Sequence, residues 1–292
     1  MLTLIPALNE KTLEPLTCLR SMLEIEVAGS TLQEVLEDRW SSVSAETDLL
    51  AAADFWPSRE LIRKIFRLNG NFSLRFNGRE VARAGLGEQL IEPETDDKNS
   101  FEIRYPWNIL QINEDALAQI TPRILGTVRE QVVVDGILVL GENSVILPGV
   151  YIEGTVVIGK NCKIGPNCYI RGTTYLGDNV HVGQAVEVKN SILMHKVAAG
   201  HLSYIGDSII CPNTNFGAGT ILSNFRHDGK NHRSMVNGEL IDTGRRKFGA
   251  ILGDGVHTGI HSSVYPGRKI WPKVSLRPGT VVQKDITEEQ LV

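Results

Sequence analysis

Four side chains between positions 171 and 201 could carry out chemistry on a charged small molecule. His201 is the best candidate for a general base, because an imidazole can take up a proton near neutral pH. Glu187 could orient His201 or tune its charge. Arg171 and Lys189 could bind a phosphate, the arginine through paired hydrogen bonds and the lysine as a point charge. We therefore predict a base and two cations at one site.

Polar groups and a turn of small residues follow this set. Tyr204, Asn215 and Asn224 offer hydroxyl and amide groups for sugar hydroxyls or a phosphate. Ala218 lies between Gly217 and Gly219, and glycines let a ligand approach the backbone closely. We expect the Ala218 N–H to donate to an oxyanion or to contact a thioester. These residue types alone indicate a base and a cationic pocket beside a Gly-rich turn.

A six-residue period predicts the scaffold that positions these groups. Aliphatic residues recur at every sixth position over a long stretch: Val134, Leu140, Ile146, Ile152, Ile158, Ile164, Ile170, Leu176, Val182, Val188. A second series runs from Leu252 to Val282. Short strands separated by tight turns produce this period, and three of them make one triangular coil. We predict a mainly β chain with a parallel β-helix over residues 123–292. The interruption after Val188 predicts that the regular coil gives way between Lys189 and Phe248.

Residues 1–122 lack this period and predict a small α/β domain. Apolar spacing and a Ser58 N-cap favour a helix over Trp56–Leu68. Alternation over residues 72–84 predicts a half-buried strand. Further helices are expected over Thr12–Glu26, Ser30–Trp40 and Tyr105–Gln119.

Composition narrows the class of protein. The net charge of −4 argues against a nucleic-acid partner. The four cysteines are scattered, which predicts buried thiols in a reducing compartment. A signal peptide and an 18-residue apolar run are both absent, so we expect a cytoplasmic protein with no membrane partner.

Several motif pieces stand in register between Glu187 and Phe225. Gly200-His201-Leu202-Ser203-Tyr204-Ile205-Gly206-Asp207 is followed at fixed offsets by Asn215, Gly217-Ala218-Gly219-Thr220 and Asn224-Phe225. This stretch resembles the acetyltransferase domain of bifunctional N-acetylglucosamine-1-phosphate uridyltransferase/glucosamine-1-phosphate acetyltransferases. The segment Tyr105–Leu110, followed by Asn113-Glu114, is similar to the helix that joins the nucleotidyltransferase domain of that family to its β-helix.

The resemblance implies a left-handed β-helix, a homotrimer with sites between subunits, and acetyl-CoA as co-substrate. It also implies an amino-sugar 1-phosphate acceptor similar to glucosamine 1-phosphate, with no metal needed for acetyl transfer. Lys230 lies near the position of the family's loop lysine. The expected coenzyme A contacts are Gly217, Ala218, Arg268, Lys269 and Pro278.

The N-terminal region departs from the family. It is about half the usual size and lacks the Gly-rich triphosphate loop, so we interpret residues 1–122 as a shortened nucleotidyltransferase-like domain without nucleotidyl transfer. Phe225 replaces a tyrosine, Ile260 replaces a small polar residue, the 226–246 loop is longer, and the family's C-terminal arm is missing. Two alternatives stay open, which are O-acylation of another sugar nucleotide and a non-catalytic trimeric binding or regulatory subunit.

Overall fold

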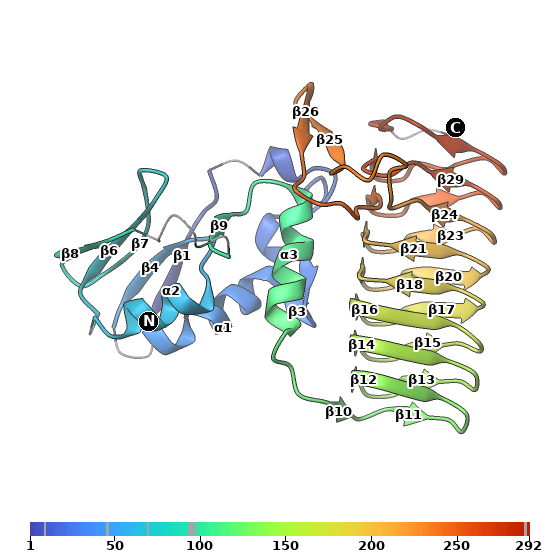
Figure 1. Cartoon of the computed structure of the whole chain (residues 1–292), viewed down its shortest axis with the longest axis horizontal. Helices are drawn as coiled ribbons and strands as arrows, with labels where there is room; N and C mark the ends of the chain where they lie inside the picture. Colours follow the sequence, from blue (N-terminus) through green and yellow to red (C-terminus); the bar gives the residue numbers. More distant parts are fainter. Residues whose placement is uncertain (9, 45–46, 69, 93–96, 98, 289–290) are drawn as a thin grey trace.

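The computed structural model describes residues 1–292 except 9, 45–46, 69, 93–96, 98 and 289–290. The chain is mostly β, with a β-solenoid of about 11 turns, and this confirms the fold class predicted from the six-residue period. Figure 1 shows the solenoid on one side and an N-terminal part, from β1 (Leu2–Ile5) to α3 (Pro106–Leu117), on the other.

Three faces of short parallel strands form the solenoid, and we name them A, B and C. Three long strands run along face A and around a corner into face B: β12 (Val133–Leu140), β14 (Tyr151–Ile158) and β16 (Tyr169–Leu176). Face A continues with β18 (Glu187–Lys189), β21 (Tyr204–Gly206), β24 (Ile221–Leu222), β29 (Ser263–Val264) and β31 (Val281–Val282).

Faces B and C complete each coil. Face B also contains β10 (Arg123–Ile124), β19 (Ile192–Leu193), β22 (Ile209–Ile210), β27 (Ile251–Leu252) and β30 (Lys269–Ile270). Face C contains β11 (Thr127–Val128), β13 (Val145–Ile146), β15 (Lys163–Ile164), β17 (His181–Gln184), β20 (Ala198–His201), β23 (Asn215–Phe216) and β28 (His257–Thr258).

The aliphatic series fills the inside of the solenoid, and it does not stop at Val188. Buried residues continue it through the supposed interruption: Leu193, Ala199, Ile205, Ile210, Phe216, Leu222. Lys189 pairs with Arg171, eighteen positions earlier, whereas Ile192 pairs with Tyr175, seventeen positions earlier. One residue is therefore lost at the corner between faces A and B. The prediction that the coil gives way over residues 189–225 is wrong, because this loss only shifts the phase of the pattern.

The 226–246 segment leaves the coil at the same corner. It carries an antiparallel hairpin of β25 (Arg233–Val236) and β26 (Glu239–Asp242), which projects beside α3 in Figure 1. Asn190 and Asp207 form this corner in the preceding two coils, with φ of 47° and 50°. Asn and Asp tolerate this left-handed conformation better than most other side chains.

A five-stranded mixed sheet forms the outer half of the N-terminal part. Its strands are ordered β1 (Leu2–Ile5), β4 (Leu49–Ala52), β7 (Arg79–Ala84), β6 (Phe72–Phe76) and β8 (Gln89–Ile91). Three α-helices accompany it: α1 (Leu32–Ser44), α2 (Arg59–Phe66) and α3 (Pro106–Leu117). Ser58 accepts a hydrogen bond from Leu61 N at 3.0 Å, so the predicted cap is confirmed.

The first predicted helix, over Thr12–Glu26, is wrong. That segment contains only the 3₁₀ turns η1 (Lys11–Leu13) and η2 (Met22–Glu24) and the first residue of β2 (Glu26–Val27). Pro15 stands near its start, and proline in a helix interior removes an N–H donor and clashes with the preceding turn. The remaining short strands are β3 (Ser30–Thr31), β5 (Phe55–Trp56) and β9 (Phe101–Glu102).

Helix α3 packs on face B and joins the two parts. One buried apolar cluster contains residues from both sides of the contact, including Trp107, Leu110, Tyr175, Ile192 and Ile209. Asn113 of α3 also donates to the carbonyl of Thr173 at 3.0 Å. Because this burial removes apolar surface from water, it stabilises the contact.

Candidate functional site

Arg171 and Lys189 occupy adjacent outward positions on face A. The register pairs Arg171 with Lys189 and Glu187 with Tyr204. Arg171 donates from Nε and from Nη2 to Glu187 Oε1, each at 2.8 Å. The expectation that Glu187 orients His201 is therefore not met, because its carboxylate is the partner of Arg171.

The carboxylate of Asp207 is the common hydrogen-bond acceptor for two other polar side chains at this face. The Asp207 side chain is only 3% exposed and accepts from Lys189 Nζ at 3.0 Å and from Asn224 Nδ2 at 2.5 Å. Asn224 Nδ2 also lies 2.9 Å from the Tyr204 hydroxyl. Burial raises the pKa of Tyr204, and the charges of Asp207 and Glu187 add to this, so its hydroxyl is held protonated. Lys189, Tyr204 and Asn224 thus lie together.

The polar network extends from face A to α3. Asn190 Nδ2 donates to Asp207 Oδ1 at 3.2 Å and to Glu114 Oε1 at 2.8 Å. Glu114 also accepts from Arg245 of the inserted segment, at 2.5 and 3.2 Å. Sequence reasoning assigned no role to these four residues. Asp207 stands inside the recognised motif and could have been found there, whereas no sequence pattern connects Glu114 with Arg245.

His201 lies outside this network, at the corner between faces C and A. It ends β20 and is exposed, with Gln184 opposite it in the preceding coil. Ala218 follows one coil later, since Gly219 N donates to the His201 carbonyl at 3.3 Å. The same column continues to Ile260 and Pro278. His201, Ala218 and Pro278 therefore share one edge of the solenoid.

The backbone N–H of Ala218, on the same edge as His201, is free to donate a hydrogen bond to a ligand. Among the backbone hydrogen bonds of the described residues, none has Ala218 N as its donor. Gly217 leaves no room for a side chain, because a Cβ there would lie 2.5 Å from the Thr258 carbonyl oxygen. The crowding at Gly217 comes from the next coil, whereas Gly217, Ala218 and Gly219 are only partly buried, so a ligand beside His201 can approach the backbone of this turn.

A single chain keeps His201 apart from Arg171 and Lys189. His201 is five positions before Gly206, the residue that pairs with Lys189. At a strand rise of about 3.3 Å per residue, roughly 10–16 Å separate the two positions. Within the described residues, no side-chain hydrogen bond or ion pair is recorded for His201. Its titratable neighbour is His181, whose pKa is lowered by burial and then by the charges of Lys163 and His201.

Asn215 and Lys230 also lie apart from the face A network. Asn215 is exposed on face C, where it pairs with Ala198 and His257. Lys230 is exposed in the inserted segment, and its backbone N–H donates to Asp228 Oδ1 at 3.1 Å. Two of the predicted substrate contacts are thus on other surfaces of the chain.

The prediction that Lys269 contacts coenzyme A is wrong, because this side chain is buried. It is an outward residue of face B, pairs with Ile251 and is 4% exposed, because the N-terminal part covers this face. Burial lowers its pKa, and the nearby carboxylates of Asp285 and Glu14 oppose this effect. The ammonium is enclosed by the chain's own groups and cannot reach a phosphate in solvent. Arg268 is partly buried and donates to the carbonyls of Pro266 and Arg233.

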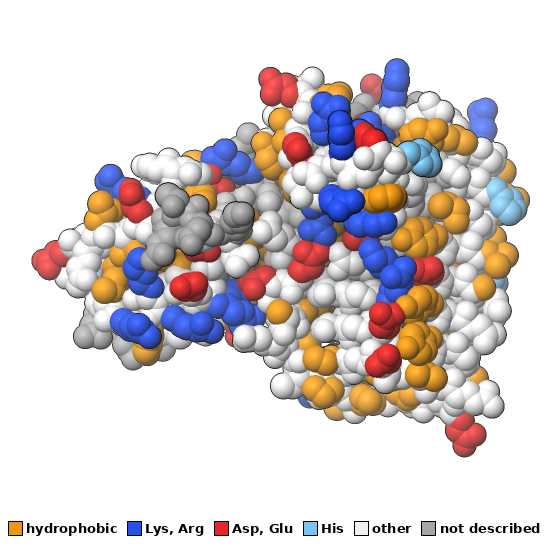
Figure 2. Space-filling view, in the orientation of Figure 1, with side chains coloured by type: hydrophobic (Ala, Val, Ile, Leu, Met, Phe, Trp, Pro, Cys, Tyr) orange, Lys and Arg blue, Asp and Glu red, His pale blue; other side chains and the backbone are white. Residues whose placement is uncertain are grey.

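Exposed apolar side chains follow the charged residues along face A. Figure 2 shows a column of hydrophobic side chains along the solenoid, next to acidic and basic ones. Ile221, Tyr265 and Val281 are 40–51% exposed. A cavity of about 610 Å³ lies between this face and the inserted segment, lined by Ile221, Phe225, Arg226, His227 and Tyr265 among others. Exposed apolar patches of this kind mark interaction sites.

The described part of the chain contains no group of three or more His, Cys, Asp or Glu side chains placed to hold a metal ion. It also contains no helix long and apolar enough to span a membrane. Cys162, Cys168 and Cys211 are buried free thiols, and Cys18 is partly exposed.

Comparisons with known proteins concern mainly the solenoid. The chain is 43% identical over 187 residues to a bifunctional sugar-1-phosphate nucleotidylyltransferase/acetyltransferase of Sulfurisphaera tokodaii, which covers 64% of this chain and 47% of that protein. It is 40% identical over 191 residues to the bifunctional protein GlmU of Methanococcus maripaludis, which covers 65% and 46%. The chain therefore spans about half the length of these relatives.

Solved structures with some likeness include PerB from Caulobacter crescentus in complex with CoA and GDP-perosamine. That structure is 14% identical, with a TM-score of 0.24, and covers 91% of this chain and 90% of PerB. The family model described as the GMPPB C-terminal domain matches residues 152–286. Residues 152–286 are thus similar to the GMPPB C-terminal domain, and the C-terminal part of the chain is similar in sequence to the bifunctional GlmU proteins.

Proposed function

We propose that this protein transfers an acetyl group from acetyl-CoA to the amine of an amino-sugar 1-phosphate similar to glucosamine 1-phosphate. The observation that carries the proposal is the edge formed by His201 and Ala218, an exposed imidazole one coil below an accessible backbone N–H. The sequence similarity to bifunctional nucleotidylyltransferase/acetyltransferases and the cations Arg171 and Lys189 of face A support the same activity. Glucosamine 1-phosphate is the acceptor that the sequence resemblance favours.

In the proposed reaction, the neutral amine attacks the thioester carbonyl carbon. His201 takes the proton that the nitrogen loses, and the Ala218 N–H donates to the oxyanion that forms. Collapse of the tetrahedral intermediate breaks the C–S bond, and the coenzyme A thiolate receives the proton from His201. Arg171 and Lys189 bind the sugar phosphate, which displaces or shares their carboxylate partners Glu187 and Asp207.

We further propose a homotrimer in which each site lies between two chains. His201 and the cations of face A are on different surfaces of one chain, so a second copy is needed to bring a base and cations together. The exposed apolar residues Ile221, Tyr265 and Val281 offer a surface for this contact. Light scattering should give three times the mass of the chain, and a monomer would contradict this site.

Release of coenzyme A thiol from acetyl-CoA in the presence of glucosamine 1-phosphate tests the function. We expect turnover by the wild type and a loss of about 10²–10⁴-fold in kcat for His201→Ala, the range of a lost general base. His257→Ala is the matched control, because His257 is also exposed and lies outward on face C, away from the cations of face A. Turnover that survives His201→Ala would remove the base assignment.

The choice of acceptor separates the two alternatives from this proposal. Turnover on a sugar nucleotide hydroxyl, with none on amino-sugar 1-phosphates, would favour O-acylation. Absence of turnover on all acceptors, with ligand binding retained, would favour a binding or regulatory subunit. We expect no UTP consumption, and any nucleotidyl transfer would overturn our interpretation of residues 1–122.

A further inference from the structure

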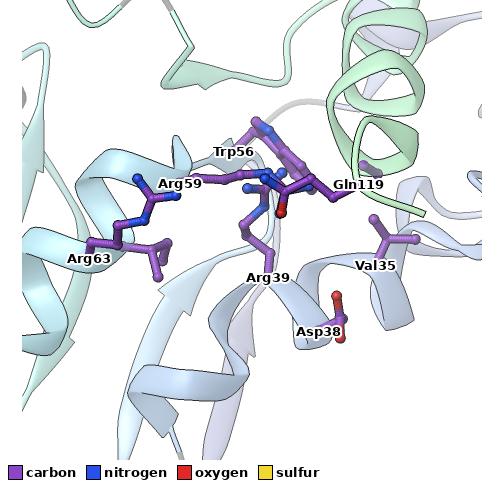
Figure 3. A pocket seen from close by; sticks show the side chains of 9 residues that line it. Val35, Asp38, Arg39, Trp56, Arg59, Arg63 and Gln119 are labelled. Carbon is purple, nitrogen blue, oxygen red and sulfur yellow. The ribbon is translucent and has the colours of Figure 1, made fainter. Parts of the chain in front are cut away.

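A cavity in the N-terminal part is lined by three arginines. It has a volume of about 300 Å³ and lies between α1, α2 and the residues that follow α3. Arg39 comes from α1, and Arg59 and Arg63 come from α2. Figure 3 shows Arg39 and Arg59 gathered with Gln119 near Trp56, with Arg63 to one side. No role for these residues follows from the solenoid or its relatives.

Arg39 is buried but has unused hydrogen-bond donors. Its side chain is 6% exposed, and its guanidinium carbon lies 4.2 Å from the centre of the Trp56 ring. Nη2 donates to Asp115 Oδ2, and no other hydrogen bond of the guanidinium is recorded within the described residues. A guanidinium has five N–H donors, so Nε and Nη1 have no acceptor among the described residues and remain available beside the cavity. A ligand oxygen in the cavity would accept from these donors.

Arg59 and Arg63 add charge that the chain does not fully balance. Arg59 donates to Gln119 Oε1 at 2.7 Å and to the Asp115 carbonyl at 3.0 Å. Arg63 is exposed, with no recorded partner in the part of the chain that the structure describes. Asp115 and Asp38 are the acidic side chains near the three arginines. The cavity therefore carries an excess of positive charge.

The pKa of the Arg39 guanidinium depends both on its burial and on the neighbouring charges. Burial lowers the pKa of its guanidinium, Asp115 opposes this, and the positive charge of Arg59 lowers it further. An anion in the cavity would attract both arginines at once.

We propose that this cavity binds the phosphate group of a small phosphorylated metabolite. Arginine forks match phosphate oxygens in geometry and donate to them in pairs. The volume suits a phosphate with a compact substituent such as one sugar. The apolar side chains of Val35, Ile62 and Ala116 provide a wall for that substituent.

The cavity is adjacent to the helix that reaches face A. Asp115, which binds Arg39, directly follows Glu114, which binds Arg245 and Asn190. Consecutive residues point about 100° apart around an α-helix, so one turn of α3 contacts both regions. The proposal concerns binding and does not rest on acetyl transfer.

Isothermal calorimetry on the full chain tests this site directly. Glucose 1-phosphate and inorganic phosphate are titrated into an Arg171→Ala/Lys189→Ala background, which removes the cations of face A. We expect saturable binding at about millimolar affinity or tighter, corresponding to roughly 4 kcal/mol or more. Absence of phosphate binding in this background would overturn the proposal.

Two substitutions in the same background locate the ligand. Arg63→Gln should weaken binding at least fivefold without lowering the melting temperature, because Arg63 is exposed and has no recorded partner. Arg67→Gln is the matched control on the same helix end, outside the cavity lining, and should leave binding unchanged. Equal phosphate affinities for Arg63→Gln and Arg67→Gln would contradict the proposed site. Binding of citrate with none of phosphate would replace the phosphate assignment with a carboxylate.

Discussion

Faces A and B belong to the same coils and both have aliphatic side chains inside, but their outward side chains differ. On face B five successive outward positions are apolar and lie in the cluster shared with the N-terminal part: Val157, Tyr175, Ile192, Ile209, Ile251. The next outward position on this face is Lys269. On face A the outward positions include Arg171, Glu187 and Lys189, all partly exposed. The inward column therefore specifies the scaffold, and the outward column specifies what each face contacts.

The largest expected difference in stability is between a charge placed on face B and the same charge placed on face A. Ile209→Asp would bury an unpaired carboxylate under the N-terminal part, at a cost of about 3 kcal/mol or more. Ile221→Asp, on face A, changes a side chain that is 40% exposed and should leave the melting temperature of the chain nearly unchanged. Thermal unfolding of the two variants measures the difference.

Light scattering on Ile221→Asp sharpens the same comparison. If face A is a subunit contact, this variant should have a lower mass than the wild type while remaining folded. A fall in melting temperature as large as that of Ile209→Asp would show that the two faces are equally covered, contrary to the present comparison.

A smaller effect is expected from Lys189→Ala on face A. The substitution leaves the buried carboxylate of Asp207 without its cation, with only amide partners, and should cost about 1–3 kcal/mol. Adding Asp207→Asn should restore part of that stability. Lys163→Ala on face C is the control, because Lys163 is exposed. Chemical denaturation measures all three, and a Lys189→Ala value equal to the control would contradict the network.

The smallest expected effect is a pH dependence from His232. Burial lowers the pKa of this side chain, which lies 3.0 Å from the Asn224 carbonyl oxygen and joins the inserted segment to face A. The unfolded chain therefore binds more protons than the folded chain below the ordinary value of 6.5. Stability should be lost as the pH falls below 6.5.

The His232→Gln variant isolates this contribution. The difference in unfolding free energy between pH 7.5 and 5.5 should be smaller in His232→Gln than in the wild type. His227→Gln, an exposed neighbour, should retain the wild-type difference. An unchanged slope in His232→Gln would mean that other groups, such as His181, account for it.

Sequence periodicity predicted the solenoid because every sixth residue meets the same interior. The Ser58 cap was predictable for a similar reason, since both partners lie within one turn. Lys189, Tyr204 and Asn224, which the motif contains, also lie together, but their role as a substrate site stays a prediction. These successes depend on local spacing or on repetition of a single coil geometry.

The remaining errors concern contacts between distant segments. Lys269 was expected to bind coenzyme A, but residues near Glu14 and Cys18 cover it, which its own repeat does not reveal. Glu187 was assigned to His201, but the coil places a corner between them and puts Arg171 alongside. Glu114 and Arg245 come from segments 131 positions apart. No short-range pattern could have predicted that they meet.

The corner between faces A and B is where this fold changes length. One residue is lost there between β16 and β19, and the 226–246 segment is inserted there, so that Ile251 pairs with Ile209 forty-two positions earlier. A change within a strand would exchange inside and outside residues, whereas a change at a corner preserves both. The polar network occupies this same corner. Insertions and deletions at this one corner can therefore change the polar groups on the surface without disturbing the aliphatic interior.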